Sequence, residues 1–201
     1  MVAVAALEYD AELMLRVKEG DNASFDELLE KYRSPVIHFL YRMVQDHGVS
    51  EELGQEVFLR VYRSRATYEP TAKFTTWLFR IATNLALNSL RDTRHQRMEI
   101  SLDAPVTADA EDGDERTLDV ADKHPDIEQH LVEEARKAMI RHAIDKLPEK
   151  QRAAVLLHKY QELDYGEIAK ILACSESALK SLLFRAYEAL RVELAPLVAR
   201  G

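Results

Sequence analysis

The stretch 163-LDYGEIAKILACSESALKSLLFRAYEALR-191 carries the pattern that decides the fold. Apolar residues recur every three or four positions in each of its halves, which is the spacing of the buried stripe of an α-helix. The two expected helices cover residues 164–172 and 175–194, and only Ala173 and Cys174 lie between them. Two helices joined by so short a turn form a candidate helix-turn-helix, a motif that DNA-binding proteins use to place the second helix in the major groove.

The second helix of this pair has an apolar face and a polar face. Ser175 is well placed to be its N-cap. The residues expected to point inward are Leu179, Leu182, Leu183, Ala186 and Leu190. The residues expected to point outward are Ser177, Lys180, Ser181, Phe184, Arg185, Glu188 and Arg191. Their hydrogen-bonding groups and positive charge suit a major groove, although a helix pair that does not bind DNA would have the same spacing.

Phe184 is unusual on a face that is otherwise polar. Three interpretations remain open: the ring contacts a thymine methyl group, it contacts a protein partner, or it folds back on the core. Cys174 lies in the turn, where a small apolar residue packs well. As the only cysteine of the chain, it is not expected to bind a metal or to act as a nucleophile.

The region before residue 98 also has helical spacing. One apolar stripe comprises Phe25, Leu28, Leu29, Tyr32, Val36, Phe39, Leu40 and Met43. Pro35 is expected to kink this helix or to begin its second half. Ser50 is expected to cap a second helix, and a third is expected from about Thr75 to about Arg97. No segment alternates like a strand, so the predicted fold class is all-α.

The third helix would separate an apolar side from a polar one. The apolar side comprises Phe74, Leu78, Ile81, Ala82 and Leu85. The polar side comprises Arg80, Asn84, Asn88, Arg91 and His95, with Trp77 among them. An exposed aromatic ring beside amides and guanidinium groups suits single-stranded nucleic acid, because the ring can stack on a base while the polar groups bind base edges and phosphates. The other interpretation has Trp77 packed on the preceding helix and the arginines merely solvated, and spacing alone does not decide between the two.

An acidic stretch separates the two helical regions. Residues 98–126 contain ten acidic and two basic residues, so they account for the whole net charge of −8. They also contain two prolines and one glycine and have no regular periodicity, which predicts a solvated, flexible linker. The predicted architecture is therefore two small helical domains, residues 1–97 and 127–201, joined by this linker. Its charge could also mimic nucleic acid and shield a basic surface.

Length and composition restrict the class of protein. The 201 residues, 47% of them apolar, allow two small packed domains, and no stretch approaches the roughly 20 apolar residues of a membrane span. The N-terminus lacks the features of a secretory signal and one cysteine cannot form an internal disulfide, so we expect a cytoplasmic protein. We find no phosphate-binding glycine loop, metal-ligand spacing or nucleophile elbow, and therefore expect no enzyme activity, no metal and no cofactor.

Three segments in a fixed order resemble motifs of one known family. They are SEELGQEVFLRVYR (residues 50–63), KFTTWLFRIATNLALNSLR (residues 73–91) and the helix-turn-helix segment quoted above. On these motifs the chain resembles the extracytoplasmic-function (ECF) class of bacterial sigma factors, over residues 22–97 and 126–194. The resemblance implies a non-catalytic subunit that directs core RNA polymerase to specific promoters and helps to melt the −10 element.

The resemblance also implies roles for individual residues. Core polymerase would be bound by Leu53, Gln55, Glu56, Phe58 and Arg60. The −10 element would be bound by Tyr68, Lys73, Phe74, Trp77, Arg80, Asn84, Asn88 and Arg91, with the loop 68–74 capturing a flipped base. The −35 element would be bound by Ser175, Ser177, Lys180, Ser181, Phe184 and Arg185. The implied partners are the polymerase core, through the coiled coil of its largest subunit and its flap, promoter DNA, and an anti-sigma factor; the linker would run toward the RNA exit path.

Three positions depart from the family pattern. The family usually has glycine where Ala173 stands, and commonly has arginine and histidine where Leu182 and Phe184 stand, which affects the expected −35 preference and not the fold.

Two other functions fit part of the pattern. One is a repressor or activator that binds duplex operator without polymerase, usually as a dimer; the other is a protein that occupies polymerase without opening promoters. The single-strand surface expected around Trp77 argues against the repressor, since a dimerisation domain has no use for it.

Overall fold

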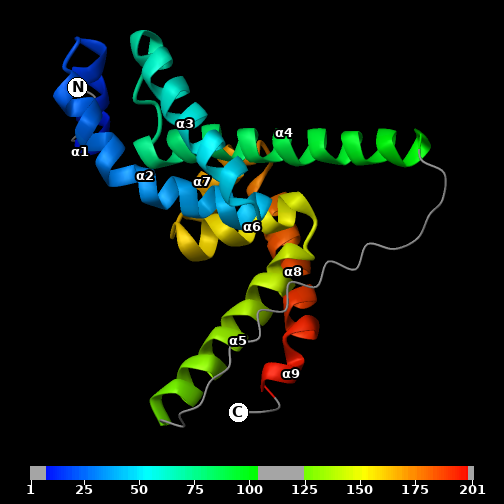
Figure 1. Cartoon of the computed structure of the whole chain (residues 1–201). Helices are drawn as coiled ribbons and strands as arrows, with labels where there is room; N and C mark the ends of the chain where they lie inside the picture. Colours follow the sequence, from blue (N-terminus) through cyan, green and yellow to red (C-terminus); the bar gives the residue numbers. More distant parts are fainter. Residues whose placement is uncertain (1–7, 104–124, 199–201) are drawn as a thin grey trace.

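The computed structural model describes residues 8–103 and 125–198, and every regular element in these ranges is helical (Figure 1). The elements are α1 Tyr9–Lys18, α2 Asn22–Val44, α3 His47–Arg63, the 3₁₀ turn η1 Ser64–Thr67, α4 Phe74–Asp103, α5 Pro125–Asp145, α6 Glu149–Tyr160, α7 Tyr165–Ile171, α8 Glu176–Glu193 and α9 Ala195–Val198. The predicted all-α class is confirmed for the described residues.

Helices α1 to α4 form the N-terminal half, in which α2 packs against α1, α3 and α4. Asp21 is the N-cap of α2, and its carboxylate accepts hydrogen bonds from the amides of Ala23 and Ser24. Pro35 lies inside α2, which continues through it to Val44 as one helix. The predicted apolar stripe of α2 faces the core: Leu28, Tyr32, Val36, Phe39, Leu40 and Met43 are buried, and Phe25 and Leu29 are partly buried.

Helix α3 begins earlier than the sequence pattern predicts. Its N-cap is Asp46, whose carboxylate accepts a hydrogen bond from the amide of Val49 at 2.8 Å. Ser50, the predicted cap, lies inside the helix, where it is buried and its hydroxyl donates to the carbonyl of His47 at 2.8 Å. The prediction was wrong because Asp46 is an equally good N-cap residue and stands in front of a further helical turn.

The boundaries of the predicted linker also change. Helix α4 continues to Asp103 and α5 begins at Pro125, so both ends of the stretch 98–126 belong to helices. The rest of the linker prediction, over 104–124, lies outside the described residues.

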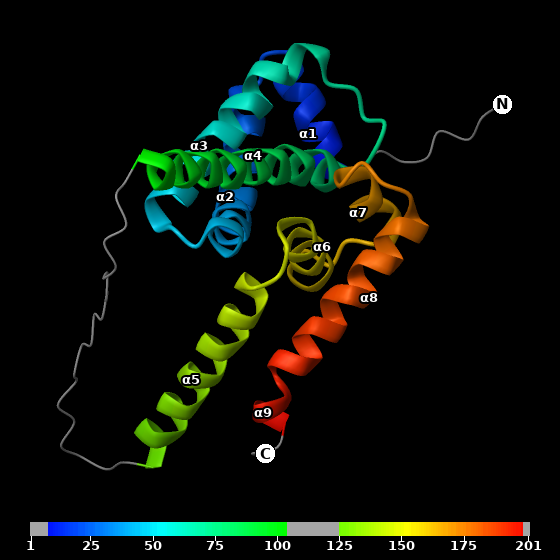
Figure 2. The same cartoon turned by 90° about the vertical axis from the view of Figure 1, so that its right-hand side faces the viewer.

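Helices α6, α7 and α8 form the helix-turn-helix region, from which α5 and α8 extend away from the body of the molecule (Figure 2). Asp164 and Glu167 form a capping box at the start of α7. Ser175 caps α8 as predicted, and its hydroxyl accepts from the amide of Ala178 at 3.1 Å. Ala173 in the turn adopts a left-handed backbone conformation with φ 50°, which explains why glycine suits this position.

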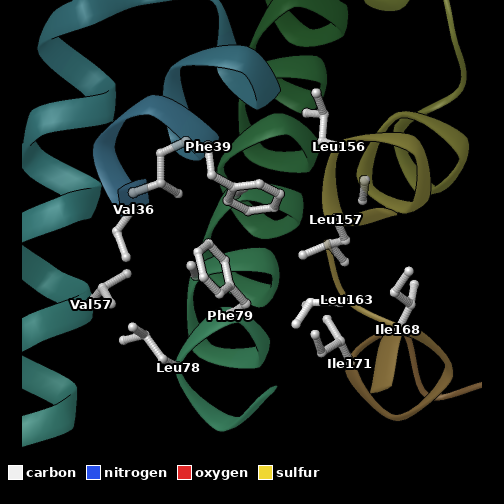
Figure 3. Close-up of a cluster of buried hydrophobic side chains, with 14 of the residues drawn as sticks. Val36, Phe39, Val57, Leu78, Phe79, Leu156, Leu157, Leu163, Ile168 and Ile171 are labelled. Atoms are coloured by element: carbon white, nitrogen blue, oxygen red, sulfur yellow. The ribbon is translucent and has the colours of Figure 1, made fainter. Parts of the chain in front are cut away.

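The two halves of the molecule share one hydrophobic core. Phe39 of α2 and Phe79 of α4 pack edge to face, with ring centroids 5.4 Å apart. Figure 3 shows these two rings between the side chains of α3 and those of α6 and α7, which include Leu157 and Ile171. Helix α7 packs on α4, and α6 packs on α2 and α4. The predicted architecture is two small helical domains joined by a flexible acidic linker, and in the described residues the two halves also pack directly against each other.

Candidate nucleic-acid interface

The polar side of α4 lies at the surface as predicted. Arg80, Asn84, Asn88, Arg91 and His95 are all exposed. The opposite side is in the core, where Phe74, Leu78, Ala82 and Leu85 are buried and Ile81 is partly buried. The helix therefore presents a row of amides and guanidinium groups at intervals of three or four residues on its exposed side.

Trp77 lies at the border between these two sides. It is half-buried, and its ring packs against Tyr68 and Phe74 at centroid distances of 5.0 Å and 5.8 Å. The sequence left two interpretations open for Trp77, an exposed ring and a ring packed on the preceding helix. In the structure it packs on Tyr68 of the loop and on Phe74, and part of its surface stays exposed. The indole rests on an aromatic layer of the core and keeps part of its surface accessible, so a base could stack on it without further rearrangement of the layer.

Tyr68 and Phe74 belong to the core and not to the surface. Their side chains are 3% and 0% exposed. Burial raises the pKa of the Tyr68 phenol to about 12, so the group stays neutral. In this conformation the two rings support Trp77 and cannot themselves contact DNA, which differs from the direct contacts expected of them.

Two residues anchor the loop between Tyr68 and Phe74: Lys18 of α1 and Glu8, which directly precedes α1. Lys18 donates a hydrogen bond to the carbonyl of Tyr68 at 3.1 Å, and the amide of Phe74 donates to the carboxylate of Glu8 at 3.3 Å. Both contacts hold the ends of the loop, and within it the amide of Thr71 donates a hydrogen bond to the carbonyl of Glu69 at 2.8 Å. The sequence pattern gave no sign of this support, because the partners lie 50 and 66 positions apart.

A small cavity of about 150 Å³ opens beside Trp77. Its lining comes from the loop, from α4 and from α7: Glu69, Thr71, Ala72, Thr76, Trp77, Arg80 and Lys170. Next to it, Lys73 of the loop forms an ion pair with Glu167 of α7 at 2.9 Å. This carboxylate raises the pKa of the Lys73 ammonium through a hydrogen bond and through charge. The predicted −10 residues Lys73, Trp77 and Arg80 are thus brought together, and α7 lies over them.

The predicted −35 residues lie on an exposed face of α8. Ser177, Lys180, Ser181 and Arg185 are exposed, and Phe184 has 68% of its surface exposed. This excludes the interpretation that Phe184 folds back on the core. The Arg185 guanidinium donates to the carbonyl of Ser181 at 3.2 Å, which aligns it along the helix. Ser175 is the exception in the set, because its hydroxyl is engaged in capping the helix.

Two of the five predicted polymerase-binding residues of α3, Gln55 and Phe58, line a largely apolar groove between α2 and α3. The groove has a volume of about 580 Å³ and is lined by Phe25, Leu29, Arg33, Ile37, Glu51, Gly54, Gln55, Phe58, Leu59 and Tyr62. Gln55 is exposed and Phe58 is buried at its base. Glu56 and Arg60 form an ion pair at 2.7 Å, and Leu53 is partly buried. Leu59, which is 49% exposed, and Ile37 also line the groove, and neither was predicted from the sequence.

Gly54 allows α2 and α3 to approach closely at this groove. A Cβ atom at this position would lie 3.0 Å from Cγ1 of Ile37.

In the ranges that the structure covers there is no group of three or more residues that could hold a metal ion. No helix in those ranges is long and apolar enough to cross a membrane.

Comparison with known proteins identifies the family of the chain. The Sigma-70 region 2 family matches residues 28–96, and the Sigma-70 region 4 family matches residues 137–190. The RNA polymerase sigma-H factor of Pseudomonas aeruginosa is 34% identical over 194 residues, covering 95% of this chain and 96% of that relative. The ECF RNA polymerase sigma-E factor of Escherichia coli K12 is 30% identical over 191 residues, covering 95% and 97%. The chain belongs to the ECF sigma factors of the sigma-70 family.

Solved structures show that the fold is shared with two other proteins. CnrH in complex with the cytosolic domain of CnrY gives a TM-score of 0.66 at 16% identity, covering 94% of this sigma factor and 99% of that chain. The sigma factor RpoE of Bartonella quintana in complex with the anti-sigma factor NepR gives 0.60 at 20% identity, covering 85% and 96%. As a sigma factor, the protein serves in promoter-specific initiation of transcription by RNA polymerase, and the families that match are not families of enzymes.

The two family matches divide this sigma factor as the structure does. Region 2 contains most of α2, all of α3 and α4 up to residue 96. Region 4 contains the second half of α5, all of α6 and α7 and most of α8. The polar face of α4 and the α2–α3 groove therefore belong to region 2, and the exposed face of α8 belongs to region 4.

Proposed function

We propose that this sigma factor recruits core polymerase and recognises promoters through three separate surfaces. The α2–α3 groove binds the coiled coil of the largest polymerase subunit. The polar face of α4, with the cavity beside Trp77, binds the melted strand of the −10 element. The exposed face of α8 reads the −35 element in duplex DNA. The polymerase performs the phosphoryl transfer, and the sigma factor contributes binding and strand separation.

The observation that carries the proposal is the arrangement on α4. Trp77 offers part of a supported indole ring, while Arg80, Asn84 and Arg91 follow along the exposed side of the same helix. An aromatic ring stacks on bases of any sequence, and the flanking guanidinium and amide groups can bind phosphates and base edges. Flipping a base out of the duplex costs a few kcal/mol, and a cavity that exists beforehand offsets part of this cost.

The groove between α2 and α3 suits a helical partner. Its base is apolar, from Phe58, Leu29 and Ile37, and its rim carries Gln55, Glu51 and Arg33. An amphipathic helix binds such a groove by placing its apolar side chains at the base and its polar ones at the rim. The same surface is open to an anti-sigma factor, and we propose one as a partner because RpoE of Bartonella quintana was solved with the anti-sigma factor NepR.

The test is promoter opening by the reconstituted holoenzyme. Core polymerase is mixed with the wild-type chain or with Trp77→Ala or Arg80→Ala, and unpaired thymines in the promoter are detected with permanganate. We expect both variants to retain core binding, measured by gel filtration, and to lose about 5- to 150-fold in open complex, since each removes about 1–3 kcal/mol of single-strand binding. Arg16→Ala, an exposed arginine of α1, is the matched control and is expected to open promoters normally.

The alternatives predict different outcomes of this experiment. A repressor or activator would bind duplex DNA without polymerase. When polymerase is added, the promoter thymines would remain unreactive to permanganate. A protein that only occupies polymerase would bind core and open nothing, even in the wild-type form. If the wild-type chain opens no promoter of its own genome, the proposal is contradicted.

The expected location is the cytoplasm, because that is where the polymerase of the related sigma factors acts.

A further inference from the structure

The carboxylate of Glu167 joins two groups of the N-terminal half at the edge of the cavity beside Trp77. Oε1 of Glu167 lies 2.9 Å from the Lys73 ammonium and accepts a hydrogen bond from the Thr76 hydroxyl at 3.3 Å. Thr76 and Glu167 are 4% and 8% exposed, so this contact is nearly closed to water. A single anionic oxygen thus binds an ammonium and a hydroxyl at the place proposed for the −10 strand.

An ammonium and a hydroxyl side by side are the groups with which proteins bind a phosphate oxygen of nucleic acid. A carboxylate oxygen carries the same sign of charge and accepts the same hydrogen bonds. We propose that Lys73 and Thr76 form a binding site for a backbone phosphate of single-stranded DNA, and that Glu167 occupies this site while the two halves of the isolated chain are packed together. This inference rests on the proposed function of α4, and it adds Thr76 to the −10 surface and Glu167 as its internal competitor.

The local structure holds Glu167 in place for this role. Its second oxygen, Oε2, accepts a hydrogen bond from the amide of Asp164 at 2.9 Å as part of the capping box of α7. Helix α7 in turn packs on α4, and Ile171 at its end is buried in the shared core. Lys170, one turn of chain further on from Glu167, lines the cavity beside Trp77. A DNA strand that enters this site must therefore displace both the carboxylate and α7.

The competition can be weakened without disturbing the helix. Glu167→Gln removes the charge, and glutamine still accepts the hydrogen bond of the capping box. Binding of the full-length chain to a short fluorescein-labelled single strand of mixed sequence is measured by fluorescence anisotropy. We expect Glu167→Gln to raise the affinity about threefold, the effect of losing one ion pair whose ammonium group is exposed to solvent. Glu12→Gln, which removes the same charge from an exposed position on α1, is the control for net charge and is expected to have a smaller effect.

Two further variants test the phosphate site independently of Glu167. Lys73→Met is expected to lower the affinity and to reduce the slope of log K against log salt by about 0.7, the value for one phosphate contact on a single strand. Thr76→Val in the Glu167→Gln background is expected to lower the affinity about threefold with the slope unchanged, because the hydroxyl is neutral. Circular dichroism of each variant verifies that its helices are intact.

The outcomes separate the inference from the function on which it rests. Equal affinities of Glu167→Gln and Glu12→Gln, or an unchanged salt slope in Lys73→Met, would overturn the inference, while promoter opening by holoenzyme would still uphold the proposed function. If holoenzymes with the wild-type and Glu167→Gln chains both fail to bind the single strand and to open promoters, the proposed function itself is wrong.

Discussion

The guanidinium of Arg152 in α6 donates a hydrogen bond to the backbone carbonyl of Met43, near the C-terminal end of α2, at 2.6 Å. The last carbonyls of a helix lack partners within the helix, and a cation at this end also interacts favourably with the helix dipole. Arg152 is 8% exposed, and it also pairs with the carboxylate of Asp145 at 2.9 Å. One side chain of region 4 therefore completes the hydrogen bonding of a helix of region 2.

We expect Arg152→Met to lower the free energy of unfolding by about 2 kcal/mol, because the buried carbonyl of Met43 loses its donor. The measurement is urea denaturation of the full chain, read as a lower midpoint at an unchanged slope. Lys150→Met, an exposed neighbour on the same helix, is the control and is expected to change the midpoint little. Equal midpoints for the two variants would show that the Arg152 contacts contribute nothing to stability.

Ala173→Gly is expected to stabilise the protein by about 1 kcal/mol. Ala173 has φ 50°, a conformation that costs an L-residue with a Cβ atom roughly 1–2 kcal/mol and costs glycine little. Part of this gain is offset by the greater freedom of glycine in the unfolded chain. The expected readout is a higher midpoint of thermal unfolding. Ala189→Gly within α8 is the opposite control, since glycine inside a helix destabilises it by about 1 kcal/mol.

Phe184→Ala is expected to weaken promoter binding and to leave stability unchanged. With 68% of its surface exposed, the ring contributes little to the core. If the exposed face of α8 reads the −35 element as proposed, the ring can contact a thymine methyl group, and each mismatched base pair in such a site costs about 1–3 kcal/mol. The check is a set of duplexes with each −35 base pair replaced in turn, bound to holoenzyme. A preference pattern identical to that of the wild type would instead assign Phe184 to a protein partner.

His158 is expected to make stability depend on pH. Its ring bonds the Tyr187 hydroxyl at 2.8 Å, and desolvation lowers its pKa below the ordinary value of 6.5. Because the unfolded chain binds the proton more readily, stability from the neutral ring is fully present above pH 6.5 and is lost as pH falls through the lowered folded pKa. Urea unfolding across this range checks the sign. His158→Gln is expected to flatten the profile, whereas His95→Gln, at an exposed position, is expected to leave it as it is.

The sequence pattern predicted the helices and their buried faces well, because three- and four-residue spacing reports directly on burial. The exposed row from Arg80 to Arg91 and the N-cap Ser175 were both predicted correctly. Helix α1 was not predicted, since ten residues with a short apolar stripe give a weak periodic signal.

The parts of the site that were missed depend on contacts between distant segments. Spacing along α4 placed Trp77 on the polar side, but Tyr68 of the preceding loop draws it partly into the core. The pairing of Glu167 with Lys73 and Thr76 joins residues more than 90 positions apart, and no local pattern can report it. For the same reason, the sequence pattern predicted two helical domains and a linker but not the packing of Phe79 against the region 4 helices, which depends on the tertiary structure.

The two halves share a core that includes Phe39, Phe79, Leu157 and Ile171, and this core makes the separation of the halves depend on temperature. Separating them would bring aromatic and aliphatic groups into contact with water, and hydration of such groups raises the heat capacity. Opening of the molecule would therefore have an enthalpy that grows with temperature. Polymerase would open this sigma factor most readily when its own apolar surfaces cover the side chains that opening exposes. Part of the apolar area buried on holoenzyme assembly would then only replace area that was buried before. Calorimetry of assembly would therefore record a heat-capacity change smaller in magnitude than the area of the new interface alone implies.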